Sequence, residues 1–237
     1  MSDVLLRCDQ LAVGYQGQAL LPPISVDVCA GEFWVVVGRN GAGKTTWLRT
    51  VLGLLPPISG SIAFPDGKPS ISYSPQRRTF DELFPVTARE VVRMGIDRGW
   101  SFLKPRGRSV EVDEAMKSAG CLELSDHTFR SLSEGQKQRV LLARMVASGA
   151  RLALLDEPTA AMDSVAERAS VRLLDQLRQR YGLAVIVVSH ALGSVAEYAD
   201  HAILLDRTLD SIVIGSPDEV FGHTDFQERY ASEELGA

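Results

Sequence analysis

The stretch from Gly38 to Thr46 reads "GRNGAGKTT"; it follows the apolar run "EFWVVV" and precedes a segment with the apolar spacing of a helix. It matches the pattern G-x-x-x-x-G-K-[ST] in the setting of strand, turn and helix. Glycines let the backbone bend so that successive amides point toward phosphate oxygens, and the start of the helix adds partial positive charge. This stretch therefore predicts an α/β fold built around a phosphate-binding loop.

The residues of this loop are expected to hold the phosphates of a nucleotide. The Lys44 ammonium supplies positive charge, and the Thr45 hydroxyl is expected to bind Mg²⁺. An ordinary Gly-rich turn is the alternative, and the strand and helix on either side disfavour it. The residues predicted to hold these phosphates are Gly38, Arg39, Asn40, Gly41, Ala42, Gly43, Lys44, Thr45 and Thr46.

Composition excludes several classes of protein. The formal charge of -5 over 237 residues gives no support to nucleic acid as the main partner, because binding a phosphate backbone needs clustered cations. No apolar run is long enough to cross a bilayer, and "MSDVLLRCDQ" lacks the features of a secretion signal, which predicts a cytoplasmic protein. Cys8, Cys29 and Cys121 show no C-x-x-C spacing, so buried reduced thiols are expected.

Strand-like and helix-like runs alternate along most of the chain. A helix is expected from Lys44 to Leu54, and "GSIAF" and "PSISYS" are expected to form a hairpin around the turn "PDGK". A mostly helical segment follows Gln76, and strands and helices alternate again after Arg151, with a helix from Ser164 to Tyr181. Apolar strands alternating with helices indicate a mostly parallel sheet covered by helices, with a helical insertion.

Two later strands are predicted to end in residues suited to phosphate chemistry. "RLALLDEP" places Asp156 and Glu157 at the end of an apolar strand. In a protein with a phosphate-binding loop, the first acid can hold Mg²⁺ and the second can orient an attacking water. "VIVVSH" ends a neighbouring strand with His190, which could reach the γ-phosphate.

The segment "LSEGQ", from Leu132 to Gln136, has two interpretations. Ser133 and Gln136 have the spacing of a capping box, in which each side chain closes an exposed amide at the start of a helix. The other interpretation is that these amides face a bound phosphate, because the start of a helix is an anion site. The segment alone does not decide between them.

Taken in order, the motifs resemble those of the nucleotide-binding subunit of an ATP-binding cassette (ABC) transporter. They are "GRNGAGKTT", Gln76 in "SYSPQ", "LSEGQKQRV", "LLDEPTAAMD" and His190, and the similarity spans nearly all residues. The resemblance implies a single ABC ATPase domain over 1–237, with ATP and Mg²⁺ as cofactors. Its fold is expected to be a P-loop NTPase core with a mostly parallel sheet, an N-terminal antiparallel β subdomain and a helical subdomain inserted at about 78–148.

The resemblance also assigns roles to residues. Tyr15 in "VGYQG" is implied to stack on adenine, although a half-buried tyrosine near a strand end would look the same. Asp163 is implied to lie at the interface of a dimer of cassettes, and it is also a plausible N-cap. The implied catalytic residues are Glu157, His190, Lys44 and Gln76; the Mg²⁺ ligands are Thr45, Gln76 and Asp156; and the residues presented to ATP in the opposite subunit are Ser133, Glu134, Gly135 and Gln136.

Two residues depart from the family pattern. Glu134 stands where the family commonly has glycine, and a carboxylate near a polyphosphate weakens binding unless it faces solvent or pairs with Lys137 or Arg139. Ala160 replaces the serine of the usual "SALD" in "AAMD". Neither removes a group needed for hydrolysis.

The segments "YSPQRRTFDELFPVTAREVVRMG" and "GSPDEVFGHTDFQERYA" resemble those of importers of manganese, zinc and iron chelates. This implies a peripheral position on the inner face of the cell membrane, and partners that include a second or paralogous cassette, transmembrane permease subunits and, through them, a substrate-binding protein. Phe80, Leu83 and Phe84 are expected either to contact the membrane subunit or to form a small core. The alternatives are a cassette without a membrane partner, acting in cluster assembly or as a regulatory clamp, and a cassette that binds ATP without turnover.

Overall fold

The computed structural model describes residues 3–76, 85–96, 109–160, 162–189, 192–224 and 226–227. The chain forms two compact units. The first consists of Met1–Lys68 and Ala184–Ala237, and the second is Pro69–Leu183. The segment 78–148, predicted to be a helical insertion, lies within the second unit, and its status as a separate subdomain stays a prediction.

The first unit contains the predicted N-terminal antiparallel sheet. Its strands β1 (Val4–Ala12), β4 (Ile24–Cys29) and β6 (Ser59–Ala63) have the order β4-β1-β6, with β1 antiparallel to both neighbours. Buried and exposed residues alternate along most of β4, as expected for a sheet with one face packed on a core. A short hairpin of β2 (Gly14–Tyr15) and β3 (Gln18–Ala19) follows β1.

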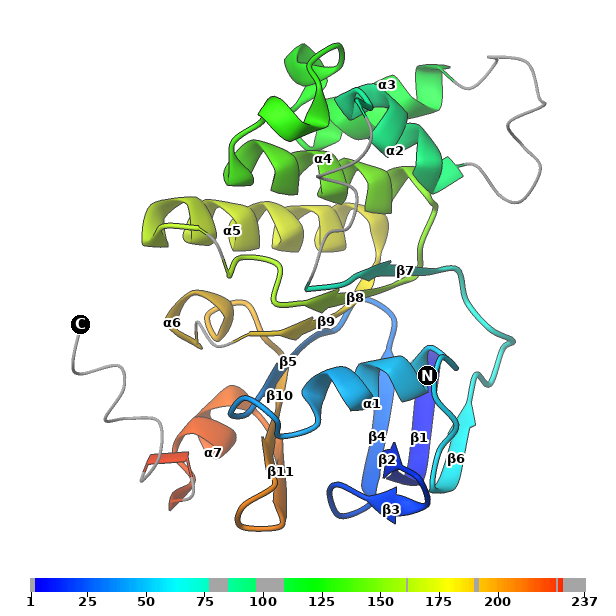
Figure 1. The fold of residues 1–237 in the computed structure, drawn as a ribbon, viewed down its shortest axis with the longest axis vertical. Helices are drawn as coiled ribbons and strands as arrows, with labels where there is room; N and C mark the ends of the chain where they lie inside the picture. Colours follow the sequence, from blue (N-terminus) through cyan, green and yellow to red (C-terminus); the bar gives the residue numbers. More distant parts are fainter. Residues whose placement is uncertain are drawn as a thin grey trace. The chain divides into compact units, whose positions relative to one another are not determined.

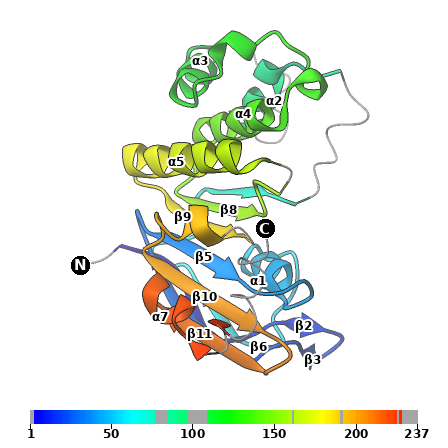
Figure 2. The same cartoon turned by 90° about the vertical axis from the view of Figure 1, so that its left-hand side faces the viewer.

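The first unit also contains parallel strands that carry the phosphate-binding loop. Strand β5 (Phe33–Val37) is parallel to β9 (Ala184–Val188) and β10 (His201–Asp206), and every residue of β5 and β9 is buried. Strands buried on both faces are typical of a parallel sheet covered by helices. The remaining elements of this unit are β11 (Ser211–Gly215), antiparallel to β10, and the helices α1 (Lys44–Val51), α6 (Leu192–Val195) and α7 (Pro217–Phe221) (Figures 1 and 2).

The second unit is built around helix α4 (Glu134–Ala147), which packs against helices on both sides (Figure 1). Gly95 allows one close approach, since a Cβ atom there would lie 2.4 Å from the carbonyl oxygen of Arg144. The other elements of this unit are α2 (Ala88–Ile96), α3 (Ser109–Ser118), η3 (Leu122–Leu124), η4 (Phe129–Ser131), α5 (Ser164–Tyr181) and the parallel pair β7 (Ile71–Ser74) and β8 (Leu152–Asp156).

The structure confirms the α/β fold class and corrects one local prediction. The turn at "PDGK" is present, with the Gly67 amide donating to the Phe64 carbonyl at 2.9 Å. The expected hairpin is nevertheless wrong, because β6 pairs with β1 and β7 pairs with β8. Each strand satisfies its backbone hydrogen bonds with a partner distant in sequence, which a local turn signal cannot reveal. In the described ranges, no helix has the length and apolar character needed to span a bilayer.

Candidate functional site

The glycines of the loop between β5 and α1 are required by its shape. A Cβ atom at Gly38 would lie 2.5 Å from the carbonyl oxygen of Leu205, closer than such contacts allow. Gly43 has a φ of 97° and forms the N-cap of α1 in the left-handed region, which side chains rarely adopt. The loop can therefore follow this path only with glycine at these positions.

Lys44 holds the loop together from within. Its side chain is buried, and its ammonium donates hydrogen bonds to the carbonyl oxygens of Gly38 and Arg39, the latter at 3.0 Å. A buried charge needs such partners, because leaving water without them is costly. No acidic residue lies in the first turn of α1, so the positive end of this helix keeps its attraction for an anion.

Tyr15 lies beside the start of α1. Its hydroxyl is 3.1 Å from the Thr46 hydroxyl, while the residue as a whole is 47% exposed. The hydroxyl is therefore anchored at the phosphate-binding loop, and much of the aromatic side chain stays accessible. This arrangement fits a stacking surface for a base, although adenine binding stays a prediction.

A polar cavity of about 310 Å³ also borders the loop. Asn40 and Gly41 line one part of it, and the turn after β10 lines another. In that turn the Asp206 carboxylate accepts hydrogen bonds from the amides of Thr208 at 2.8 Å and Leu209 at 3.1 Å. This turn and β11 were not predicted from the sequence, although the alternation in "SIVIG" indicates a strand.

Gln76 and Glu157 meet at the ends of the parallel strands β7 and β8. The Gln76 amide nitrogen donates a hydrogen bond to the Glu157 carboxylate. Asp156, the last residue of β8, is 2% exposed, whereas Glu157 is only partly buried and has a φ of 50°. Non-glycine residues with positive φ are uncommon and gather at functional sites. The structure thus joins two of the predicted site residues through a direct contact.

The start of α4 confirms the capping interpretation of "LSEGQ". Ser133 is the N-cap; its hydroxyl accepts from the Gln136 amide at 3.3 Å, and the Gln136 side chain accepts from the Ser133 amide at 3.0 Å. Gly135 is not required by this geometry, because among described atoms a Cβ there would meet only the Cβ of Ala166, at 4.0 Å. A glycine early in a helix costs stability, so its presence points to a role outside the packing of this chain.

The structure shows which expected contact Glu134 makes, and it confirms Asp163 as an N-cap. The Glu134 carboxylate pairs with the Lys137 ammonium at 2.9 Å, while Arg139 donates to the Gly120 carbonyl at 3.1 Å. Asp163 is the N-cap of α5 and accepts from the amides of two residues in the first turn. Its contact with a second cassette stays a prediction.

Some predicted site residues lie outside the described residues. These are His190 and the three aromatic or apolar residues Phe80, Leu83 and Phe84. All three cysteines are described, and none forms a disulfide. Burial raises the pKa of Cys8 and of Cys121 to about 12, so both stay protonated at neutral pH.

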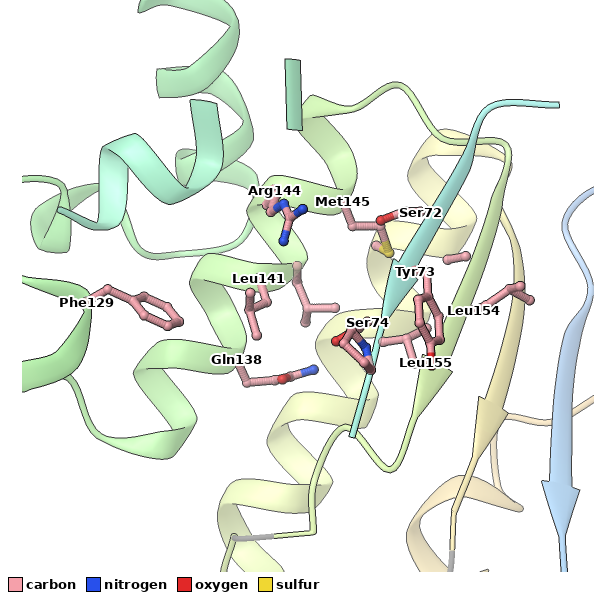
Figure 3. A pocket seen from close by; sticks show the side chains of 13 residues that line it. Ser72, Tyr73, Ser74, Phe129, Gln138, Leu141, Arg144, Met145, Leu154 and Leu155 are labelled. Carbon is pink, nitrogen blue, oxygen red and sulfur yellow. The ribbon is translucent and has the colours of Figure 1, made fainter. Parts of the chain in front are cut away.

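A smaller cavity of about 50 Å³ lies within the second unit (Figure 3). Gln138, Leu141 and Arg144 project into it from α4, and residues of β7 and β8 line the other side. Its lining is mostly apolar, and burial lowers the pKa of the Arg144 guanidinium. Strand β7, which lines this cavity, ends just before Gln76 and the stretch predicted to meet a membrane subunit.

Comparison with known proteins shows the family. A family model described as "ABC transporter" matches residues 21–160. The zinc import ATP-binding protein ZnuC of Pseudomonas putida is 34% identical over 232 residues, covering 97% of this chain and 85% of that protein. The manganese transport system ATP-binding protein MntB of Bacillus subtilis is 36% identical over 232 residues, covering 95% and 92%.

A solved structure of a metal-chelate type ABC transporter in an inward-facing conformation is similar in fold. It superposes with a TM-score of 0.84 at 28% identity, covering 97% of this chain and 90% of that chain. The family model's match over residues 21–160 includes the loop that holds Lys44 and the strand end with Asp156 and Glu157. This chain therefore belongs to the ABC transporter family and is an ATP-binding, ATP-hydrolysing subunit of that family.

Proposed function

We propose that this chain powers the import of a metal ion or metal chelate through separate membrane subunits. The observation that carries this proposal is the similarity, over at least 95% of the chain, to ATP-binding proteins named for zinc import and manganese transport. The similar solved structure, a metal-chelate type transporter, supports the same class of cargo. The cargo would pass through the membrane subunits and would not be a ligand of this chain.

The phosphate-binding loop fits ATP. Its glycines fix a path on which amides can face phosphate oxygens, Lys44 adds a cation, and the first turn of α1 has no acid to oppose an anion. We assign the triphosphate to Gly38–Thr46 and the adenine base to the exposed ring of Tyr15. The hydrogen bond between the hydroxyl groups of Tyr15 and Thr46 would then couple base binding to the start of the helix.

The donor set also fits Mg²⁺, which prefers oxygen ligands. Thr45 offers a hydroxyl, Asp156 a buried carboxylate, and Gln76 an amide oxygen, because its nitrogen is the atom that donates to Glu157. When bound, Mg²⁺ neutralises charge that develops on the phosphate oxygens. We propose that these three residues hold it.

Hydrolysis is assigned to Glu157, which would take a proton from the water that attacks the γ-phosphate in line. Gln76 orients this carboxylate by its hydrogen bond. His190 would position the γ-phosphate, as its place in the sequence predicts. The first turn of α4 from a second cassette would contact the same phosphate through Ser133 and Gly135, with Glu134 and Gln136 beside them, and Asp163 would lie at that interface.

The partners we propose are a second copy or paralogous cassette, the permease subunits and, through them, a substrate-binding protein, at the inner face of the cell membrane. The permease would dock at the stretch after Gln76.

Purification from the native host tests this function against that of a cassette in cluster assembly or a regulatory clamp. The tagged chain should be recovered from detergent-solubilised membranes together with an integral membrane protein. The purified complex, placed in vesicles, should take up zinc or manganese only with ATP, and a complex carrying Glu157→Gln should not. Recovery without any membrane protein would favour the clamp or assembly function.

A further inference from the structure

We propose that Glu134 and Lys137 act as one electrically neutral unit that sets how much ATP is needed to join two cassettes. The inference rests on the proposed function, in which ATP bound by one cassette meets the start of α4 of the other. Lys137 is the positioning residue of this unit, since its ammonium binds the Glu134 carboxylate.

The two side chains form a partly shielded ion pair. The Lys137 ammonium lies 2.9 Å from the Glu134 carboxylate, and the side chains are 11% and 39% exposed, respectively. Water screens such a pair less than one on the open surface, so each charge strongly influences its surroundings. A lysine so close to the positive start of a helix is unfavourable by itself, and the acidic partner offsets this repulsion.

The surroundings of the pair are open toward an approaching anion. Gly135 directly follows Glu134, and among described atoms a Cβ at that position would meet only Ala166. The Ser133 oxygen already accepts a hydrogen bond in the cap, so its hydroxyl hydrogen remains the atom suited to a phosphate. A carboxylate left unneutralised among these donors would repel the phosphate that they are shaped to meet.

The proposal fixes the order in which variants should associate. The pair has no net charge in the natural protein, a charge of -1 in Lys137→Met and +1 in Glu134→Gly, and none in the double variant. Methionine keeps the apolar stem of Lys137, which limits the loss of packing. A twofold dimer contains two copies of the start of α4, so each substitution changes the charge at two interfacial sites.

The experiment measures the ATP concentration that gives half dimerisation by sedimentation, in a Glu157→Gln background that blocks turnover. Lys137→Met should need at least about tenfold more ATP than the parent and Glu134→Gly at least about tenfold less, while the double variant returns near the parent. The differences should shrink as salt rises from about 0.05 to 0.3 M. Arg139→Met is the matched control, because it also removes a cation from α4. The Arg139 guanidinium donates to the Gly120 carbonyl and is not part of the pair.

A purely structural role gives a different pattern. If the pair only stabilised α4, both single variants would lower the unfolding temperature of the ATP-free monomer and shift dimerisation in the same direction. That result, or a Lys137→Met variant indistinguishable from Arg139→Met, overturns the proposal for the pair alone. Failure of the Glu157→Gln parent to dimerise with ATP would instead refute the two-cassette reaction, and this inference with it.

Discussion

The Glu157→Gln substitution tests the proposed chemistry at one residue with little change of shape. Glutamine keeps the size of the side chain and can accept the same hydrogen bond from Gln76 through its amide oxygen. It also tolerates the φ of 50° at this position to the same degree as glutamate, so the backbone should not move. What the substitution removes is the negative charge that can accept a proton from water.

The expected loss of activity greatly exceeds the expected loss of stability. Removing a general base lowers the rate by about two to four orders of magnitude, or about 3 to 5.5 kcal/mol in activation free energy. Replacing a charge-assisted hydrogen bond with a neutral one at this partly exposed site should cost about 1 kcal/mol of unfolding free energy. ATP binding should persist, because the residues assigned to the phosphates are unchanged.

The assay combines phosphate release with size-exclusion chromatography in saturating Mg-ATP. The variant should release phosphate at least about a hundredfold more slowly and should shift from monomer to dimer as ATP accumulates between two cassettes. Asp210→Asn is the matched control, since it makes the same chemical change at an exposed residue that also has a φ of 50°, in the turn between β10 and β11. Hydrolysis at the parental rate would show that Glu157 is not the base.

Two further predictions concern buried groups. Lys44→Ala should reduce Mg-ATP affinity in calorimetry by at least about a hundredfold and lower the unfolding temperature slightly, because the loop carbonyls of Gly38 and Arg39 also lose their donor; unchanged affinity would refute the loop assignment. Cys8 and Cys121 should react with a maleimide at about pH 8 only after unfolding, since the folded-state pKa of each is raised to about 12. Their stabilising contribution should be complete below the unfolded pKa of about 8.5 and be lost as pH rises toward 12, so the denaturation midpoint should fall over that range; rapid labelling of the native protein would contradict this.

Features set by neighbours in sequence were predictable here. Helix α5 runs from Ser164 to Tyr181 as predicted, because Asp163 caps its start and Gly182, with a φ of 64°, ends it. The pairing of Glu134 with Lys137 over Arg139 also follows a local rule, since residues three apart face each other on a helix and residues five apart do not.

Features set by distant parts of the chain were not predictable. The turn near Gly67 suggested a hairpin, but the partners of β6 and β7 lie elsewhere in the sequence. The contact between Gln76 and Glu157 joins residues far apart in the chain and depends on side-chain conformation. Motif order could place both residues at the ends of strands, but it could not show that one donates to the other.

The left-handed backbone at Glu157 sets stability and activity against each other. A non-glycine residue in this region carries strain of the order of 1 kcal/mol or more, which glycine would not. Glycine there would thus tend to make the protein harder to unfold while it deletes the carboxylate. A library of variants selected for thermostability alone would therefore enrich inactive variants at this position. Selection for a more stable protein must measure ATP hydrolysis at the same time.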